Sequence, residues 1–370
     1  MKKNSIIAIA ACVALAACTK NELKPVEVDQ QITFQAVVNK ASTKAGTTFD
    51  NGVTYPTDRP FGTVAYKVKG SESELYIPVS EVKYNSTDAY WSTEAAYYWP
   101  KESGSSLTFY SYSPFNYSET STSETGTPTA IPVTPAATGL TFENYSVKDH
   151  QKTDLMVADK KAGQTSNTSN AGGSWATGVP TVFHHMLAQI VAINFQTVEN
   201  ASGNPVVVKD YANGHDGTSE HKYVAGDKQF VVTDVYFEKF FEQGTLSAGD
   251  AWSWVSTGSV TDSYTWYRKT SEPAKFIKGK CTPRNTYYLV LPQTHSDDAM
   301  LHVKYEIHTY TSASEHATEK MDVSVPLKNL NAKWEMNKKY TYTLNIDLDR
   351  IYWDPKVTEC ESESTGSAEI

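Results

Sequence analysis

The residue with the clearest potential for chemistry is the thiol of Cys18, because of what precedes it. Two lysines near the N-terminus lead into an uncharged, apolar run at residues 6–17. Such a run is too short to span a bilayer and has the length of the apolar part of a signal peptide. Two alanines, small enough for a signal peptidase cleft, directly precede the thiol. The sequence therefore predicts that residues 1–17 are a signal peptide.

The segment that ends at Cys18 resembles the lipobox of bacterial lipoproteins. It consists of Leu15, Ala16, Ala17 and Cys18. The resemblance implies that the thiol takes a diacylglycerol before cleavage and that the lipid anchors the chain to the cell outer membrane. Buried methylene groups contribute about 0.8 kcal/mol each, so a multiply acylated cysteine anchors firmly. The plainer alternative is an ordinary signal peptide that contains a cysteine.

Two other thiols, Cys281 and Cys360, remain in the exported chain, because Cys12 leaves with the signal peptide. An oxidising compartment permits one disulfide between them, and two free thiols are an equal alternative. The sequence has no Cys-x-x-Cys pair. It therefore predicts neither a zinc knuckle nor a thioredoxin-like site.

Histidines offer the other candidate chemistry. His184 and His185 are adjacent, and neighbours along a strand point to opposite faces, so packing roles are favoured over shared metal ligation. A second group crowds one polar segment and could hold a cation: Asn213, His215, Asp216 and His221. Its spacing matches no calcium loop, so a solvated loop is favoured and no metal site is predicted.

Motifs of the common enzyme classes are absent from the sequence, which has no G-x-S-x-G, H-E-x-x-H, P-loop or dinucleotide-binding pattern. Any fold of this size can assemble a pair of carboxylates, so a glycosidase pair stays open. The net charge of −9 and the lack of a basic cluster in the mature chain disfavour nucleic acid as a partner. We therefore predict a non-catalytic protein without a cofactor.

The elements that carry these residues are predicted to be strands, from the alternation of apolar and polar side chains. Residues 32–38 alternate in this way, and a small, basic segment with Lys40 and Lys44 follows them. The apolar positions of this first strand are Ile32, Phe34, Ala36 and Val38. Further strands are predicted at residues 61–69, 75–79, 96–99, 107–112, 154–158, 190–195, 230–237, 286–291, 300–310, 321–326 and 340–348. A short helical turn is the alternative at the start of residues 182–195.

Short strands, turn residues and the lack of long helical patterns predict an all-β fold built from antiparallel β-sandwiches. The 370 residues are too many for one ordinary sandwich and suit two domains in tandem, of roughly 150 residues each. We expect a signal peptide at 1–17, a lipidated tether with the first strand at 18–44, and sandwich domains at 45–178 and 179–370. The polar stretches 118–138 and 160–178 are expected to be loops.

Several segments, in order along the chain, resemble the fimbrillin family, the Mfa-like or type V pilins of Bacteroidales. They are the lipobox, the strand with Ile32 and Phe34 before a Lys-Ala break, Tyr98-Trp99-Pro100, residues 107–114, residues 154–158, residues 183–188 and residues 334–340. The resemblance implies two β-sandwich domains and assembly with other pilin subunits into surface fimbriae.

In such pilins a surface protease cuts after a basic residue and removes the first strand. The emptied groove then accepts a strand from a neighbouring subunit, which satisfies its unpaired backbone groups and apolar trough. In this chain the removable strand would be residues 32–38, cut after Lys40 or Lys44. Residues 351–357 are the candidate donor segment within the second domain. The sequence leaves open whether the subunit belongs to the stalk, the anchor or the tip, and which receptor it binds.

The alternative function is a glycan-binding surface lipoprotein with aromatic platforms on loops. Trp252 and Trp254, or Trp175, are its candidate residues. For three other tryptophans core packing is the favoured interpretation: Trp91, Trp99 and Trp334.

Acylation of Cys18 is directly testable. Mass spectrometry of the protein extracted from membranes should find a diacylglyceryl or triacyl adduct on Cys18, because the lipobox places this thiol at the cleavage point. A mature N-terminus at another residue, without lipid, would contradict the expectation.

Overall fold

The computed structural model describes residues 30–39, 52–117, 129–149, 153–167, 178–197, 224–269, 274–275, 280–281, 283, 287–346 and 351–359. Its regular structure is almost entirely β, with one helical turn, α1 (Leu327–Leu330). The expected all-β class is confirmed. Within the described residues, no helix is long and apolar enough to cross a membrane.

The first sheet contains nine strands. They are β1 (Phe34–Asn39), β2 (Gly52–Thr54), β3 (Phe61–Lys69), β4 (Glu72–Asn85), β5 (Tyr90–Thr93), β6 (Ser105–Ser113), β11 (Met156–Ala158), β12 (Lys161–Gln164) and β13 (Val179–His185). Their order is β11-β13-β1-β5-β4-β3-β6-β12, and β2 pairs with β1. Since β11 also pairs with β6, the strands from β11 to β6 form a closed ring.

The inside of this ring is the first core. Alternate side chains point into it because successive residues of a strand face opposite sides. Its largest fully buried members are Phe34, Tyr55, Phe61, Phe109 and Phe183. The aromatic rings meet edge to face or tilted, a geometry that favours ring contacts.

A second sheet covers the outer face of β3, β6 and β11. It has the order β17-β16-β10-β9 and consists of β9 (Thr134–Ala136), β10 (Gly139–Ser146), β16 (Phe241–Ala248) and β17 (Trp252–Val260). Leu140 and Phe142 of β10 and Leu246 of β16 pack there against Tyr110 and Tyr112 of β6. Beside it, β7 (Asn116–Tyr117) pairs with β8 (Thr129–Ala130).

The third core lies between two five-stranded sheets. One consists of β14 (Ala188–Thr197), β20 (Lys280–Cys281), β21 (Tyr288–Val290), β26 (Lys338–Ile346) and β27 (Ile351–Glu359). The other consists of β15 (Lys228–Glu238), β18 (Tyr264–Arg268), β19 (Ala274–Lys275), β23 (Met300–Tyr310) and β24 (His316–Pro326). Two short strands, β22 (Gln293–Thr294) and β25 (Lys333–Trp334), pair with each other. Trp266, Trp334, Tyr305, Tyr340 and Tyr342 are fully buried between the sheets.

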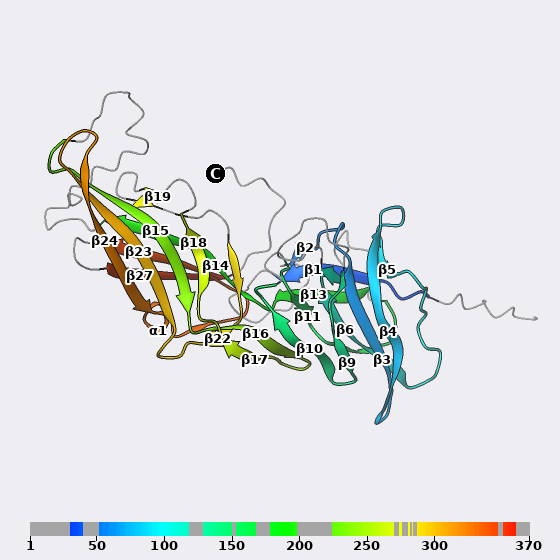
Figure 1. Ribbon diagram of the computed structural model, residues 1–370. Coiled ribbons are helices and arrows are strands. Elements are labelled where there is room, and N and C mark those ends of the chain that lie inside the picture. Colours follow the sequence, from blue (N-terminus) through cyan, green and yellow to red (C-terminus); the bar gives the residue numbers. More distant parts are fainter. Residues whose placement is uncertain are drawn as a thin grey trace, which may run out of the picture.

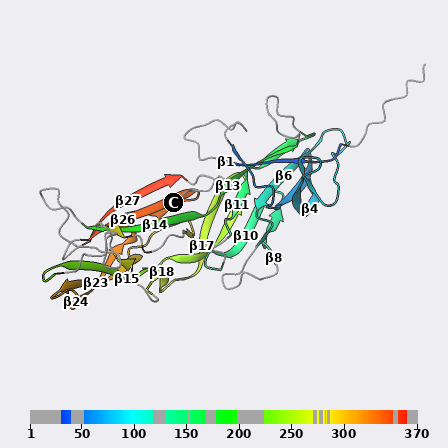
Figure 2. The same cartoon turned by 90° about the horizontal axis from the view of Figure 1, so that it is seen from above.

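The molecule is elongated. The strands from β1 to β6 lie at one end, the sandwich with β15, β23 and β24 lies at the other, and β10, β16 and β17 lie between them (Figure 1). The view from above shows the same order (Figure 2). β13 pairs with β1 and β11, and β10 pairs with β16, so three strand pairings cross residue 178. The division into domains 45–178 and 179–370 stays a prediction.

Several local expectations are wrong. The stretches 118–138 and 160–178, expected to be loops, contain short strands: β8 and β9 lie in the first and β12 in the second. Residues 182–185 belong to β13 rather than to a helical turn, because Val179, Thr181, Phe183 and His185 alternate into the core. Residues 96–99 form no strand; Tyr98 makes a single bridge to Gln31. In contrast, β3 and β23 match the predicted bounds 61–69 and 300–310.

Candidate strand-exchange site

The first strand, β1, has one continuous neighbour and one interrupted one. On one side it runs parallel to β13 through five consecutive pairs, from Phe34–Val179 to Val38–Phe183. On the other side three separate pieces contact it: the bridge at Gln31, one pair to β5 at Phe34, and β2 at its C-terminal end. If β1 left, the edge of β13 would be exposed as an unbroken template for another strand.

Both faces of this strand are buried. Ile32, Phe34, Ala36 and Val38 are 1%, 1%, 5% and 3% exposed and belong to the core inside the ring. Between them, Val37 is fully buried on the opposite face. The Phe34 ring contacts Phe61 and Phe109 edge to face, each at a centroid distance of 5.8 Å. The strand therefore fills an apolar groove that crosses the whole core.

Gly178 lets β1 pass close to the start of β13. A Cβ atom at Gly178 would lie 2.7–2.9 Å from the backbone C, N and Cα atoms of Phe34. These are backbone atoms of a buried strand, so they cannot rotate away as a side chain would. The position accepts only glycine as long as β1 keeps its place.

The N-terminal part of the first strand is held on both edges before β1 itself begins. On one edge, the Ile32 amide donates to the Tyr97 carbonyl at 2.8 Å, and the Trp99 amide donates to the Gln30 carbonyl at 3.2 Å. On the other edge, the Asn167 side chain accepts from the Thr33 amide at 3.2 Å and donates to the Gln31 carbonyl at 2.8 Å.

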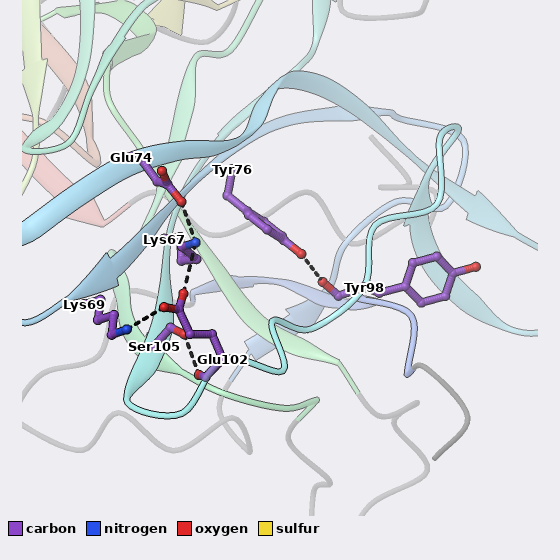
Figure 3. Close-up of polar contacts among 7 residues, drawn as sticks. All are labelled: Lys67, Lys69, Glu74, Tyr76, Tyr98, Glu102 and Ser105. Atoms are coloured by element: carbon purple, nitrogen blue, oxygen red, sulfur yellow. Dashed lines mark hydrogen bonds and ion pairs between the residues drawn. The ribbon is translucent and has the colours of Figure 1, made fainter. Parts of the chain in front are cut away.

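We call residues 97–102 the strap, because this segment crosses the N-terminal part of the first strand and is fixed from outside. The Tyr76 hydroxyl donates to the Tyr98 carbonyl at 2.7 Å. Glu102 lies between Lys67 and Lys69, at 3.3 Å and 2.5 Å (Figure 3). Hydrogen bonds from Lys69 and Lys67 hold the pKa of Glu102 below its ordinary value. Exposed ion pairs of this kind are individually weak, so the strap is positioned by several small contributions.

The two adjacent histidines bind separate carboxylates on opposite faces of β13. His184 Nε2 lies 3.0 Å from Asp159, and His185 Nδ1 lies 2.5 Å from Asp154. Burial alone would lower the pKa of His185, but the Asp154 charge and its hydrogen bond outweigh burial and raise that pKa. The two pairs therefore link β13 to the residues on either side of β11: Asp154 lies just before that strand and Asp159 directly after it. Among the described residues, no group of three His, Cys, Asp or Glu side chains could hold a metal.

The tryptophans proposed for glycan binding take part in packing. Trp252 lies against the His184 ring at 4.7 Å, and Trp254 donates to the Met186 carbonyl at 2.7 Å. The three tryptophans expected in cores are buried: Trp91, Trp99 and Trp334.

Several predicted site residues lie outside the described residues: Cys18, Lys40, Lys44, Trp175, Asn213, His215, Asp216, His221 and Cys360. Lys40 and Lys44 belong to the connection between Asn39 and Gly52, which pair with each other at the end of β1 and β2. Cys281 pairs with Phe195 as part of β20. The roles of these residues in lipidation, cleavage and disulfide formation stay predictions.

Sequence reasoning missed Asn167 and Gly178, which hold the first strand in place. Both belong to the polar stretch that was expected to be a loop and boundary. Neither takes part in an apolar alternation, so no periodic signal marks them. A glycine directly before a predicted strand was the one available hint, because glycine permits close backbone approach.

This architecture defines an all-β protein with a strand buried across its first core and joined to the rest through a single connection. The chain belongs to the fimbrillin-like family, whose model matches residues 43–365. No curated protein sequence matches it.

One solved structure supports the fold, and two further ones are similar to a lesser degree. A fimbrial protein from Bacteroides vulgatus is 18% identical, with a TM-score of 0.58, and the match covers 90% of this chain and 99% of that one. A putative cell adhesion protein from Bacteroides uniformis is 13% identical with a TM-score of 0.42, covering 89% and 98% of the two chains. Another from Parabacteroides distasonis is 12% identical with a TM-score of 0.43, covering 90% and 100%.

Replacement of Gly178 by alanine should loosen β1. The added Cβ would push against the Phe34 backbone, so we expect the free energy of unfolding to fall by roughly 1–3 kcal/mol, the usual cost of overpacking. Urea denaturation gives this change, and hydrogen exchange of the Phe34 to Val38 amides locates it. Unchanged stability together with unchanged amide protection would contradict the close approach.

The contribution of Asp154 to stability should depend on pH. Because the folded-state pKa of His185 is raised, the electrostatic contribution of the pair is fully present below about pH 6.5 and is lost as the pH rises through that pKa. The destabilisation caused by Asp154→Asn should therefore be larger near pH 5.5 than near pH 8, by urea denaturation at each pH. Asp250→Asn is the matched control, since it removes an exposed carboxylate that pairs with Lys160. An equal effect of Asp154→Asn at both values would refute the pairing.

Proposed function

We propose that this chain is a fimbrial subunit or accessory adhesin that is exported as a lipoprotein and assembled by protease-triggered strand exchange. Cleavage after Lys40 or Lys44 frees the first strand, and a strand from another pilin subunit replaces it. The observation that carries this proposal is the position of β1, which packs one face into the first core, is also buried on its other face, and has β13 as its continuous neighbour.

The apolar burial of β1 fits a groove that is filled in the precursor and later takes another strand. Burial of a large apolar side chain contributes roughly 1.5–3 kcal/mol, and β1 buries Phe34, Val37 and Val38 beside Ile32. With β1 in place the precursor has no empty groove and stays monomeric. A strand of similar alternation recovers the same burial, so exchange costs little at equilibrium and only the release of β1 is slow.

The connection between β1 and β2 is where one cut separates the strand. Asn39 and Gly52 pair with each other, so both ends of the connection lie at the same end of the groove. A cut there leaves β2, β5 and β13 in the mature subunit and removes only the covalent link to β1. The first strand is then held by hydrogen bonds and apolar contacts alone.

The donor is proposed to come from a neighbouring subunit. The candidate segment of this chain coincides with β27, which pairs with β26 along its whole length and lies at the edge of its sheet. Pro355 of β27 stands opposite Tyr342, and an edge strand tolerates proline because one of its sides needs no amide donors. An edge strand can leave its sheet by breaking hydrogen bonds on one side only.

The maturation route is tested with the double variant Lys40→Ala and Lys44→Ala. It should remain a full-length, lipidated monomer on the cell and be absent from sheared fimbriae, because β1 then never loses its covalent link. Lys83→Ala is a matched control, since Lys83 is an exposed lysine of β4 that pairs with Glu81.

Wild-type amounts of the double variant in sheared fimbriae would overturn this route. Failure of the unmodified protein to polymerise after cleavage would instead favour a glycan-binding lipoprotein. Pull-down on immobilised polysaccharides would then identify that function.

A further inference from the structure

The side chain of Asn167 makes the two hydrogen bonds to the first strand that a residue of a neighbouring β-strand would make. In a parallel ladder, one residue donates its N–H to the carbonyl of residue i−1 of its neighbour and accepts from the N–H of residue i+1. The Asn167 amide makes this pattern around Ile32: its Nδ2 donates to the Gln31 carbonyl and its Oδ1 accepts from the Thr33 amide.

This contact lies where β13 stops. The Val179 amide donates to the Thr33 carbonyl at 2.7 Å, and Phe34–Val179 is the first pair of the β1–β13 ladder. The next bonds toward the N-terminus, to the Thr33 amide and the Gln31 carbonyl, come from Asn167 instead of a further strand residue. Asn167 therefore lengthens the template that β13 presents to the occupant of the groove.

Trp99 fixes the orientation of the Asn167 amide. The Trp99 Nε1 atom donates to Asn167 Oδ1 at 3.1 Å. An indole N–H and a backbone N–H only donate, and a backbone carbonyl only accepts, so one orientation of the amide satisfies all three partners.

We propose that Asn167, oriented by Trp99, is a binding site for the backbone of the strand that occupies the groove. It holds β1 in the precursor and then binds the incoming donor strand in the same direction, parallel to β13. Both of its hydrogen bonds to the strand are to backbone atoms, so the site accepts strands of different sequence. This inference rests on the proposed strand exchange.

The test uses the full-length chain with a site-specific protease sequence inserted between Lys44 and Ala45. After cleavage, a dye-labelled peptide with the sequence of residues 30–39 is added in excess, and its entry and later dissociation are followed by fluorescence anisotropy. In Asn167→Ala we expect the peptide to dissociate about tenfold faster than from the wild type, since two backbone hydrogen bonds are lost.

A second peptide identifies the atom involved. It carries an ester in place of the amide at Thr33, which removes the N–H that donates to Asn167 Oδ1. From the wild type this peptide should dissociate about fivefold faster than the amide peptide, while from Asn167→Ala the two peptides should dissociate alike. That coupling requires the incoming strand to have the direction and register of β1. A merely structural role of Asn167 would not produce it.

Two further variants complete the design. Gln164→Ala is the matched control, because the half-buried Gln164 side chain donates to the nearby Ala162 carbonyl rather than to the first strand, and it should leave both rates unchanged. Asn167→Asp keeps the oxygen that accepts from the Thr33 amide but puts a second oxygen where Nδ2 donates to the Gln31 carbonyl. It should therefore also accelerate dissociation, and it serves as the test if Asn167→Ala fails to fold.

The outcomes separate the two claims. Equal ester effects in the wild type and in Asn167→Ala would overturn the Asn167 site while leaving strand exchange intact. No entry of either peptide into the cleaved wild-type protein would overturn strand exchange itself, and the Asn167 site with it.

Discussion

The whole first sheet depends on β1 closing it. The strands from β11 to β6 form a ring, and within that ring β1 joins β13 to β5. A closed sheet has no free edge, and its alternate side chains share one interior. The same closure makes β1 the most consequential strand to lose. Its departure opens the ring, unpairs β13 along five residues and exposes the aromatic core around Phe61, Phe109 and Phe183.

Sequence alone predicts the strands that alternate cleanly and fails where the backbone is irregular. The pattern at Ile32, Phe34, Ala36 and Val38 locates the first strand and the face it buries. In β10 the register shifts between Phe142 and Tyr145, and Asn144 has a φ of 51°, so the alternation of its apolar residues is broken. In β16 and β17 many buried or half-buried positions are Gly, Ser, Thr or Gln, which resemble a loop in composition.

The contacts that hold the strand were harder to predict than the strand itself. Asn167 is 134 residues from Thr33 along the chain, and Gly178 matters only because β1 passes beside it. Such contacts follow from three-dimensional closure rather than from local propensity. The adjacent histidines show the opposite case. Strand geometry alone places His184 and His185 on different faces, and the structure gives each its own carboxylate.

The arrangement along the first strand gives its release an order. The connection with Lys40 and Lys44 follows Asn39, so a cut there frees the end of β1 that pairs with the short strand β2. Asn167 and the strap hold the other end, at Gln31 to Thr33. In the proposed exchange, an incoming strand would start at the freed end and displace β1 pair by pair along β13, so that few hydrogen bonds are broken at any moment. The contacts to Asn167 would be the last to pass from β1 to the incoming strand. One groove can thus be filled in the precursor and still admit a new strand in the proposed exchange. The reason is that one end of β1 pairs with the short strand β2, whereas the other end of the first strand is held by Asn167 and the strap.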